Sequence, residues 1–74
     1  MSARSVRLEY PPSLLGRPVI QDLVRRFDLA VNILQAQISM EEGWIEVHLT
    51  GEESEIARAV EWLAVQGLRV EPMP

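Results

Sequence analysis

The chain has 74 residues, which is room for one domain with one hydrophobic core. It contains no cysteine, so disulfides, cysteine-ligated metal centres and thiol nucleophiles are excluded. Eleven acidic residues outweigh seven arginines, and the net charge of −4 disfavours nucleic acid and anionic membranes as partners. No apolar run approaches the roughly 18 residues of a membrane span, so we expect a cytoplasmic protein without membrane insertion.

The first predicted elements are a strand and a helix. Apolar and polar residues alternate in the strand, whose expected buried face is Val6, Leu8 and Tyr10. The tandem prolines that follow end it. Pro18 then suits the first position of a helix. The apolar stripe of that helix has spacings of three, four and seven residues, and consists of Ile20, Leu23, Val24 and Phe27.

Residues 30–39 predict a second strand, because they are rich in apolar side chains and lack Gly and Pro. Strict alternation puts four residues on each face: Asn32, Leu34, Ala36 and Ile38 on one, and Val31, Ile33, Gln35 and Gln37 on the other. Both faces carry apolar residues. One face is therefore expected to pack on the helices, and the other to meet a partner subunit.

Residues 40–43 have the length of a hairpin loop, and the alternation that follows predicts a third strand, antiparallel to the second. Thr50 and Glu53 have the spacing of a capping box, which would start a second helix. Its apolar stripe would be Ile56, Ala59, Val60 and Leu63. Gly67 would end the helix in a left-handed conformation, and Leu68 and Val70 would open a last strand.

This order predicts an α+β fold, a ferredoxin-like βαββαβ plait with a four-stranded antiparallel sheet and two helices on one face. Residues 1–74 would form a single domain. The opposite face of the sheet stays open, and we expect function there.

The sequence contains few residues that could catalyse a reaction. His48 is the sole histidine and has no sequence-local acid or hydroxyl arranged as a triad, so it is interpreted as a surface or interface residue. Glu52, Glu53 and Glu55 fall in the first turn of the second predicted helix, where negative charge favours the helix dipole. No nucleotide-binding or nucleophile motif occurs. We therefore expect no enzyme activity, no metal site and no cofactor.

Other residues leave two interpretations open. Trp44 and Trp62 could each be an interface anchor or a ring at the edge of the core. Arg25 and Arg26 fit a solvated helix face. Asn32 stands between apolar neighbours in the second strand, so its amide could be a satisfied structural group or could hold a ligand.

The run FDLAVNIL, residues 27–34, resembles the NIL domain, which is named after the tripeptide standing here as Asn32-Ile33-Leu34. The similarity extends from residues 6–8 through residues 50–51 and 60–63 to residues 66–71. NIL domains are C-terminal regulatory pieces of the ATPase subunit of methionine ABC importers, where an ACT-like plait dimerises and binds methionine. The resemblance implies a homodimeric amino-acid sensor linked to amino-acid transport.

The resemblance also implies site residues. Asn32 matches the family's asparagine that holds methionine, and the neighbouring candidates are Ile33 and Leu34. Weaker candidates come from the turn after the first strand: Leu14, Leu15 and Gly16. The chain lacks an ATPase region, so the alternative is an oligomerisation or protein-docking module that has lost the ligand and docks a transporter or enzyme subunit through its sheet face and Trp44.

Overall fold

The computed structural model describes residues 1–74 and shows the predicted order of elements. A short 3-10 turn, Pro12–Leu14, follows the first strand. The strands and helices are β1 (Ser2–Tyr10), α1 (Val19–Arg26), β2 (Leu29–Ile38), β3 (Gly43–Gly51), α2 (Glu53–Gln66) and β4 (Arg69–Pro72). Neither helix is long and apolar enough to cross a membrane.

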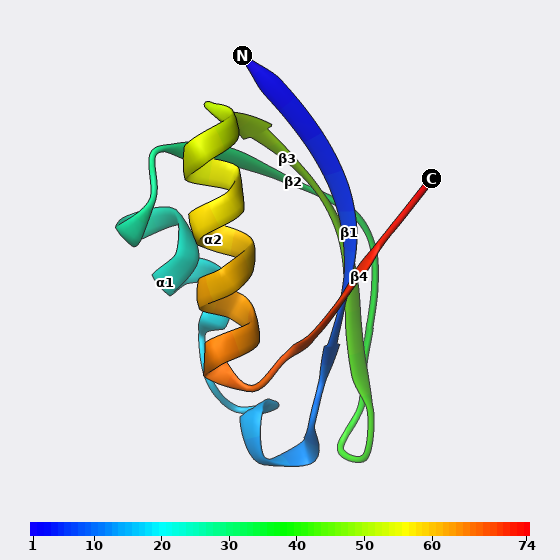
Figure 1. Ribbon diagram of the computed structural model, residues 1–74. Coiled ribbons are helices and arrows are strands. Elements are labelled where there is room, and N and C mark those ends of the chain that lie inside the picture. Colours follow the sequence, from blue (N-terminus) through cyan, green and yellow to red (C-terminus); the bar gives the residue numbers. More distant parts are fainter.

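The four strands form one sheet in the order β2-β3-β1-β4, and every neighbouring pair is antiparallel. Both helices cover the same face of this sheet, and the other face is open (Figure 1). The predicted ferredoxin-like plait is confirmed. Its edge strands are β2 and β4.

The core lies between the sheet and the helices, and it contains the predicted inward residues of β1 and β3. Alternate residues of a strand point to the same face, so the sequence pattern translates directly into burial. In α2 the stripe prediction is also confirmed, although Val60 is only half-buried. The buried apolar residues are Val6, Leu8, Leu14, Val19, Leu23, Ile45, Val47, Leu49, Ile56, Ala59, Leu63 and Leu68.

The start of α1 differs from the prediction. The Val19 N–H donates to the Arg17 carbonyl at 2.9 Å, and Pro18 has φ −81° and ψ 63°. This is an inverse γ-turn, which leaves Pro18 outside the helix as its N-cap. Of the expected stripe, Leu23 is buried and Ile20 and Phe27 pack against the core, but Val24 is 45% exposed, and Val19 is buried in addition.

The two faces of β2 also differ from the prediction. Ile33 lies opposite Val47 of β3, but Gln35 lies opposite the adjacent residue Glu46, so Leu34 is an extra, unpaired residue in a β-bulge. A one-residue insertion exchanges the faces of all the residues beyond it. Ala36 and Ile38 therefore share the helix-side face with Val31 and Ile33, rather than the face of Asn32.

The predicted capping box does not form. Thr50 remains in β3, opposite Ala30 of β2 and Ala3 of β1, so strand pairing on both sides extends β3 past the expected helix start. Helix α2 begins at Glu53 without a side-chain cap. Glu53 instead pairs with Arg4 of β1, 3.0 Å away.

The end of α2 agrees with the prediction. Gly67 has φ 109°, a left-handed conformation in which an L-residue would be strained. The Leu68 N–H reaches back to the Leu63 carbonyl at 3.2 Å and satisfies one of the last helical acceptors. The chain thereby reverses and returns Leu68 to the core.

The phenol of Tyr10 is partly enclosed at the end of β1, and this burial raises its pKa. The folded protein therefore holds the phenol proton more tightly than the unfolded chain does. Above a pH of about 10, where an unfolded tyrosine ionises, the unfolding free energy should fall with rising pH until the folded pKa is passed. We expect denaturant titrations between about pH 9 and 11 to show this fall, and Tyr10→Phe to remove it. A fall of equal size in the variant would contradict the assignment.

Candidate functional site

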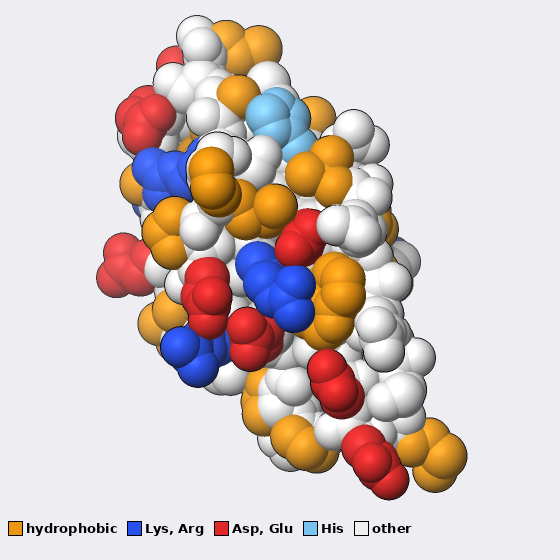
Figure 2. Space-filling model, turned by 90° about the vertical axis from the view of Figure 1, so that its right-hand side faces the viewer, with side chains coloured by type: hydrophobic (Ala, Val, Ile, Leu, Met, Phe, Trp, Pro, Cys, Tyr) orange, Lys and Arg blue, Asp and Glu red, His pale blue; other side chains and the backbone are white.

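The open face of the sheet is a mosaic of polar and charged side chains with a few apolar ones (Figure 2). The strand register groups its residues into rows across the sheet. One row contains Asn32 of β2, His48 of β3 and Ser5 of β1. The next row contains Gln35, Glu46, Arg7 and Glu71, one from each strand.

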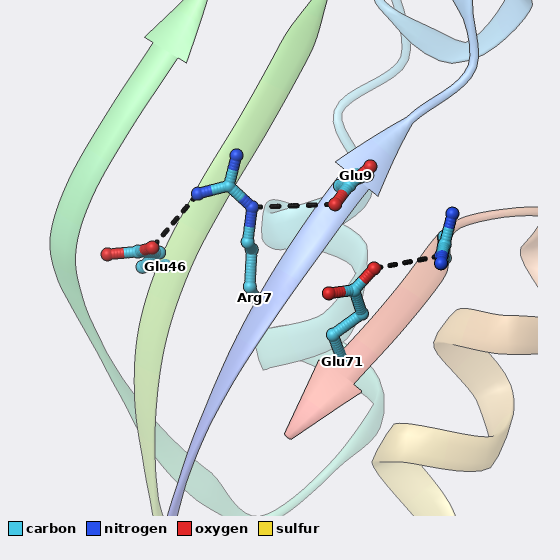
Figure 3. Close-up of polar contacts among 5 residues, drawn as sticks. Arg7, Glu9, Glu46 and Glu71 are labelled. Carbon is cyan, nitrogen blue, oxygen red and sulfur yellow. Dashed lines mark hydrogen bonds and ion pairs between the residues drawn. The ribbon is translucent and has the colours of Figure 1, made fainter. Parts of the chain in front are cut away.

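Arg7 is the centre of a network that spans β1, β2 and β3. Its guanidinium donates to Glu46 at 3.0 Å and lies 3.5 Å from Glu9 (Figure 3). Glu46 also accepts from the Gln35 amide at 2.8 Å. On β4, Glu71 pairs with Arg69 at 2.8 Å. The charges of this face are thus largely compensated within the chain.

Trp44 belongs to the same network. The Arg7 guanidinium lies 4.0 Å above the centre of the Trp44 ring, a cation–π contact that covers the indole. The ring is half-buried. This cover weakens the case for Trp44 as an anchor for a partner protein.

His48 lies on the outward face, as predicted, and shares a hydrogen bond of 2.9 Å with the Ser5 hydroxyl through Nδ1. A serine beside a histidine is the core of a nucleophilic dyad. No carboxylate is hydrogen-bonded to this ring, and neither residue lines a cavity. The pair is therefore a cross-strand contact that supports the sheet.

The candidate residues Asn32, Ile33 and Leu34 all lie on the open edge strand. Asn32 is exposed on the open face, opposite His48. Ile33 is 54% and Leu34 48% exposed. Helix α1 cannot cover the strand, because its 8 residues span about 12 Å against about 33 Å for the 10 residues of β2.

The other three candidates lie elsewhere. Leu14 is buried in the core, Leu15 lies next to Gly43 at the start of β3, and Gly16 is exposed. Gly43 is five positions along β3 from His48, the partner of Asn32, which is about 17 Å. One copy of the chain does not bring the turn and the tripeptide together, and their joint site stays a prediction.

Sequence reasoning missed an aromatic contact on the helix side. Phe27, just after α1, meets Trp62 of α2 edge to face, with ring centres 5.9 Å apart. Periodicity assigned Phe27 to a helical stripe and could not show which ring it meets. A hollow lies at the N-terminal end of α2, where β2 starts and β3 ends. No three His, Asp or Glu side chains converge in a metal-binding cluster.

Comparison with known proteins gives a consistent result. The model of the NIL domain family matches residues 4–72. The methionine import ATP-binding protein MetN 3 of Bacillus cereus is 42% identical over 60 residues, covering 76% of this chain and 18% of that protein. MetN of Halalkalibacterium halodurans is 35% identical over 74 residues, covering 95% and 22%. The chain spans about a fifth of the length of these relatives.

A solved structure agrees with the fold. The C-terminal domain of an ABC transporter ATP-binding protein from Enterococcus faecalis superposes with a TM-score of 0.84 and 27% identity. The match covers 95% of this chain and 82% of that one. The similarity therefore includes the whole plait rather than one motif.

Proposed function

The chain belongs to the NIL domain family, and from this premise we propose that it is a non-catalytic, cytoplasmic regulatory domain that binds methionine or a similar apolar amino acid. In this proposal it acts as a homodimer in connection with amino-acid transport. The names of its relatives support the transport link, since they are methionine import ATP-binding proteins. The match to a C-terminal transporter domain supports a regulatory rather than a catalytic role.

The observation that carries the proposal is the open edge of β2. This strand has 10 residues, with no proline and no charged side chain, and one of its sides has no hydrogen-bonding neighbour. Folded proteins normally protect such edges with charges, prolines or short strands. The other edge is protected in this way, since β4 has 4 residues, includes Arg69 and Glu71, and ends at Pro72.

A second copy would protect β2. Two antiparallel β2 strands related by a two-fold axis would satisfy the free backbone groups of both and cover the exposed side chains of Ile33 and Leu34. The same pairing would bring two Asn32-Ile33-Leu34 segments to one interface. Because no cavity borders Asn32 in a single copy, the proposed ligand site is completed by the partner.

The ligand chemistry follows from these groups. The Asn32 amide has donors and an acceptor for the polar end of an amino acid. Ile33 and Leu34 offer apolar surface for its side chain. Leu14, Leu15 and Gly16 of the partner copy are weaker candidates for the same site, since within one copy Leu15 lies beside Gly43, about 17 Å along β3 from the residue opposite Asn32.

Thermal melts against single amino acids test this proposal. A ligand that binds only the folded state raises the unfolding free energy by about 2.7 kcal/mol at 100 times its dissociation constant. For a domain of this size the midpoint should rise by about 11–22 °C. We expect methionine to produce this rise and Asn32→Ala to reduce it.

Gln37→Ala is the matched control, because Gln37 is a second exposed amide of β2 on the open face. It should leave the methionine effect unchanged. If no amino acid shifts the melt at millimolar concentration, the sensor proposal fails and the ligand-free oligomerisation or docking module becomes the better account. Unfolding of Asn32→Ala would instead assign Asn32 a structural role.

A further inference from the structure

His48 of β3 and Asn32 of β2 lie directly opposite each other on neighbouring strands. Both side chains belong to the open face of the sheet, because Val47 and Leu49, on either side of His48, are buried in the core on the helix side. Residues paired in this way have Cβ atoms about 4.5–5.5 Å apart. A small molecule bound over Asn32 would therefore touch the imidazole, which is at the surface of this face (Figure 2).

The hydrogen bonds within the chain leave one nitrogen of the imidazole free. Nδ1 shares its hydrogen bond of 2.9 Å with the Ser5 hydroxyl of β1, on the side away from β2. Nε2 has no hydrogen-bond partner in the chain, and neither has the Asn32 amide. In the tautomer that accepts the serine proton at Nδ1, Nε2 carries the ring proton and is a donor. His48 Nε2 and Asn32 Nδ2 are then two free N–H donors side by side.

The charged side chains around His48 are already paired. Arg7, two residues beyond the Ser5 position in β1, and Glu46, two residues before His48 in β3, lie 3.0 Å apart. Strand β2 has no charged side chain, and on β4 Glu71 pairs with Arg69. Histidine is the side chain that ordinarily changes its charge between about pH 5 and 8. His48 is therefore the group beside Asn32 whose charge responds to pH in this range.

The free groups match the two charged ends of an α-amino acid. Its carboxylate would accept hydrogen bonds from His48 Nε2 and Asn32 Nδ2, and its ammonium would donate to Asn32 Oδ1. The reverse orientation lacks a carboxylate to receive the ammonium beside His48. Both oxygens of Glu46 already accept hydrogen bonds, one from Arg7 and one from Gln35.

We infer that His48 is a second contact of the proposed ligand site, where it binds the carboxylate of the amino acid and makes binding tighter as the pH falls. This inference rests on the proposed function, because it concerns the orientation of the same ligand. A protonated imidazole attracts a carboxylate more strongly than a neutral one does. The ligand carboxylate stays ionised between about pH 5.5 and 7.5, so the change in affinity would come from the protein.

Binding measurements at two pH values test the inference. Calorimetric titration with methionine should give a Kd about two- to fivefold lower at about pH 5.5 than at about pH 7.5, the effect of an exposed ion pair. The chain has one histidine, so the NMR signal of its ring C–H groups is unambiguous, and methionine should shift it. Methioninol has a hydroxyl in place of the carboxylate. It should bind more weakly than methionine, and equally at both pH values.

His48→Gln identifies the group responsible, because glutamine keeps an N–H donor but cannot gain a charge. At about pH 7.5 the variant should bind methionine within about twofold of the parent chain, and it should lose the gain at about pH 5.5. The matched control combines His48→Gln with Gln21→His. Gln21 is an exposed residue of α1, so this variant returns an imidazole to the helix side, away from Asn32. It should not restore the gain.

The outcomes separate this inference from the sensor proposal. If methionine binds with the same Kd at both pH values, or more tightly at the higher one, the His48 contact is wrong and the sensor proposal stands. An equal gain at low pH in His48→Gln, or a His48 signal that does not move when methionine binds, has the same meaning. If methionine binds at neither pH, both proposals fail.

Discussion

Leu34→Lys is expected to convert the proposed dimer, of about 17 kDa or twice the mass of the 8.4 kDa chain, into a monomer. Leu34 is the unpaired residue of the β2 bulge and is 48% exposed in a single copy. Pairing of two β2 strands would bury it. Because about half of Leu34 is already covered in a single copy, the substitution removes roughly 0.7–1.5 kcal/mol of apolar burial from each copy and brings two positive charges together at the interface, which weakens dimerisation by at least about tenfold.

Analytical ultracentrifugation at micromolar concentration measures this effect. Met40→Lys is the control, because Met40 is also apolar and exposed but lies in the hairpin loop after β2. It makes the same change of charge and should leave the dimer intact. A parent chain that sediments as a monomer, or a Leu34→Lys dimer as strong as the parent, would show that β2 is not the dimer interface.

Leu8→Ala is expected to lower the unfolding free energy by about 3 kcal/mol, within the range for truncating a fully buried leucine. Leu8 is 0% exposed in β1, opposite Ile45 of β3 and Val70 of β4. A domain of 74 residues has about 4–11 kcal/mol of stability in total. The loss should lower the melting midpoint by about 12–24 °C.

Val24→Ala is the comparison variant, since Val24 is also an aliphatic residue in the predicted stripe of α1 but is 45% exposed. Its cost should stay within about 0.5 kcal/mol. Urea titrations of both variants measure the difference. Equal losses in the two variants would place Val24 in the core and restore the stripe predicted from periodicity.

The sequence identified the candidate edge residues but not the surface they form. The family resemblance singled out Asn32, Ile33 and Leu34, and the structure places all three on an open edge strand. The turn residues Leu14, Leu15 and Gly16 were proposed for the same site, yet in one copy of the chain Leu15 lies beside Gly43, about 17 Å along β3 from the residue opposite Asn32. The turn and the Asn32-Ile33-Leu34 segment can meet only if a second copy brings them together. The sequence of one chain does not show which residues form an interface between two copies.

The contact between Phe27 and Trp62 was not predictable from the pattern of either helix. Phe27 was assigned to the stripe of α1, but it is the residue just after that helix and has an extended backbone. Its ring meets Trp62, which is 35 positions further along the chain. Trp62 itself was left between two interpretations. Contacts between elements distant in the chain depend on how the helices pack on the sheet, which local periodicity does not encode.

What the sequence determined by itself is the order of elements and the inward faces of β1, β3 and α2. Apolar residues recur at every second position of β1 and β3 and at every third or fourth position of α2, without interruption. The local pattern therefore agrees with the burial in the folded chain. The tertiary structure decided the faces of β2 and the start of α2. In both cases a pairing to another strand changed the local pattern: a bulge of β2 against β3, and strand pairing of Thr50 on both sides. Hydrogen bonds between segments outweigh a local preference of about 1 kcal/mol, and this is why those elements could be assigned only from the folded chain.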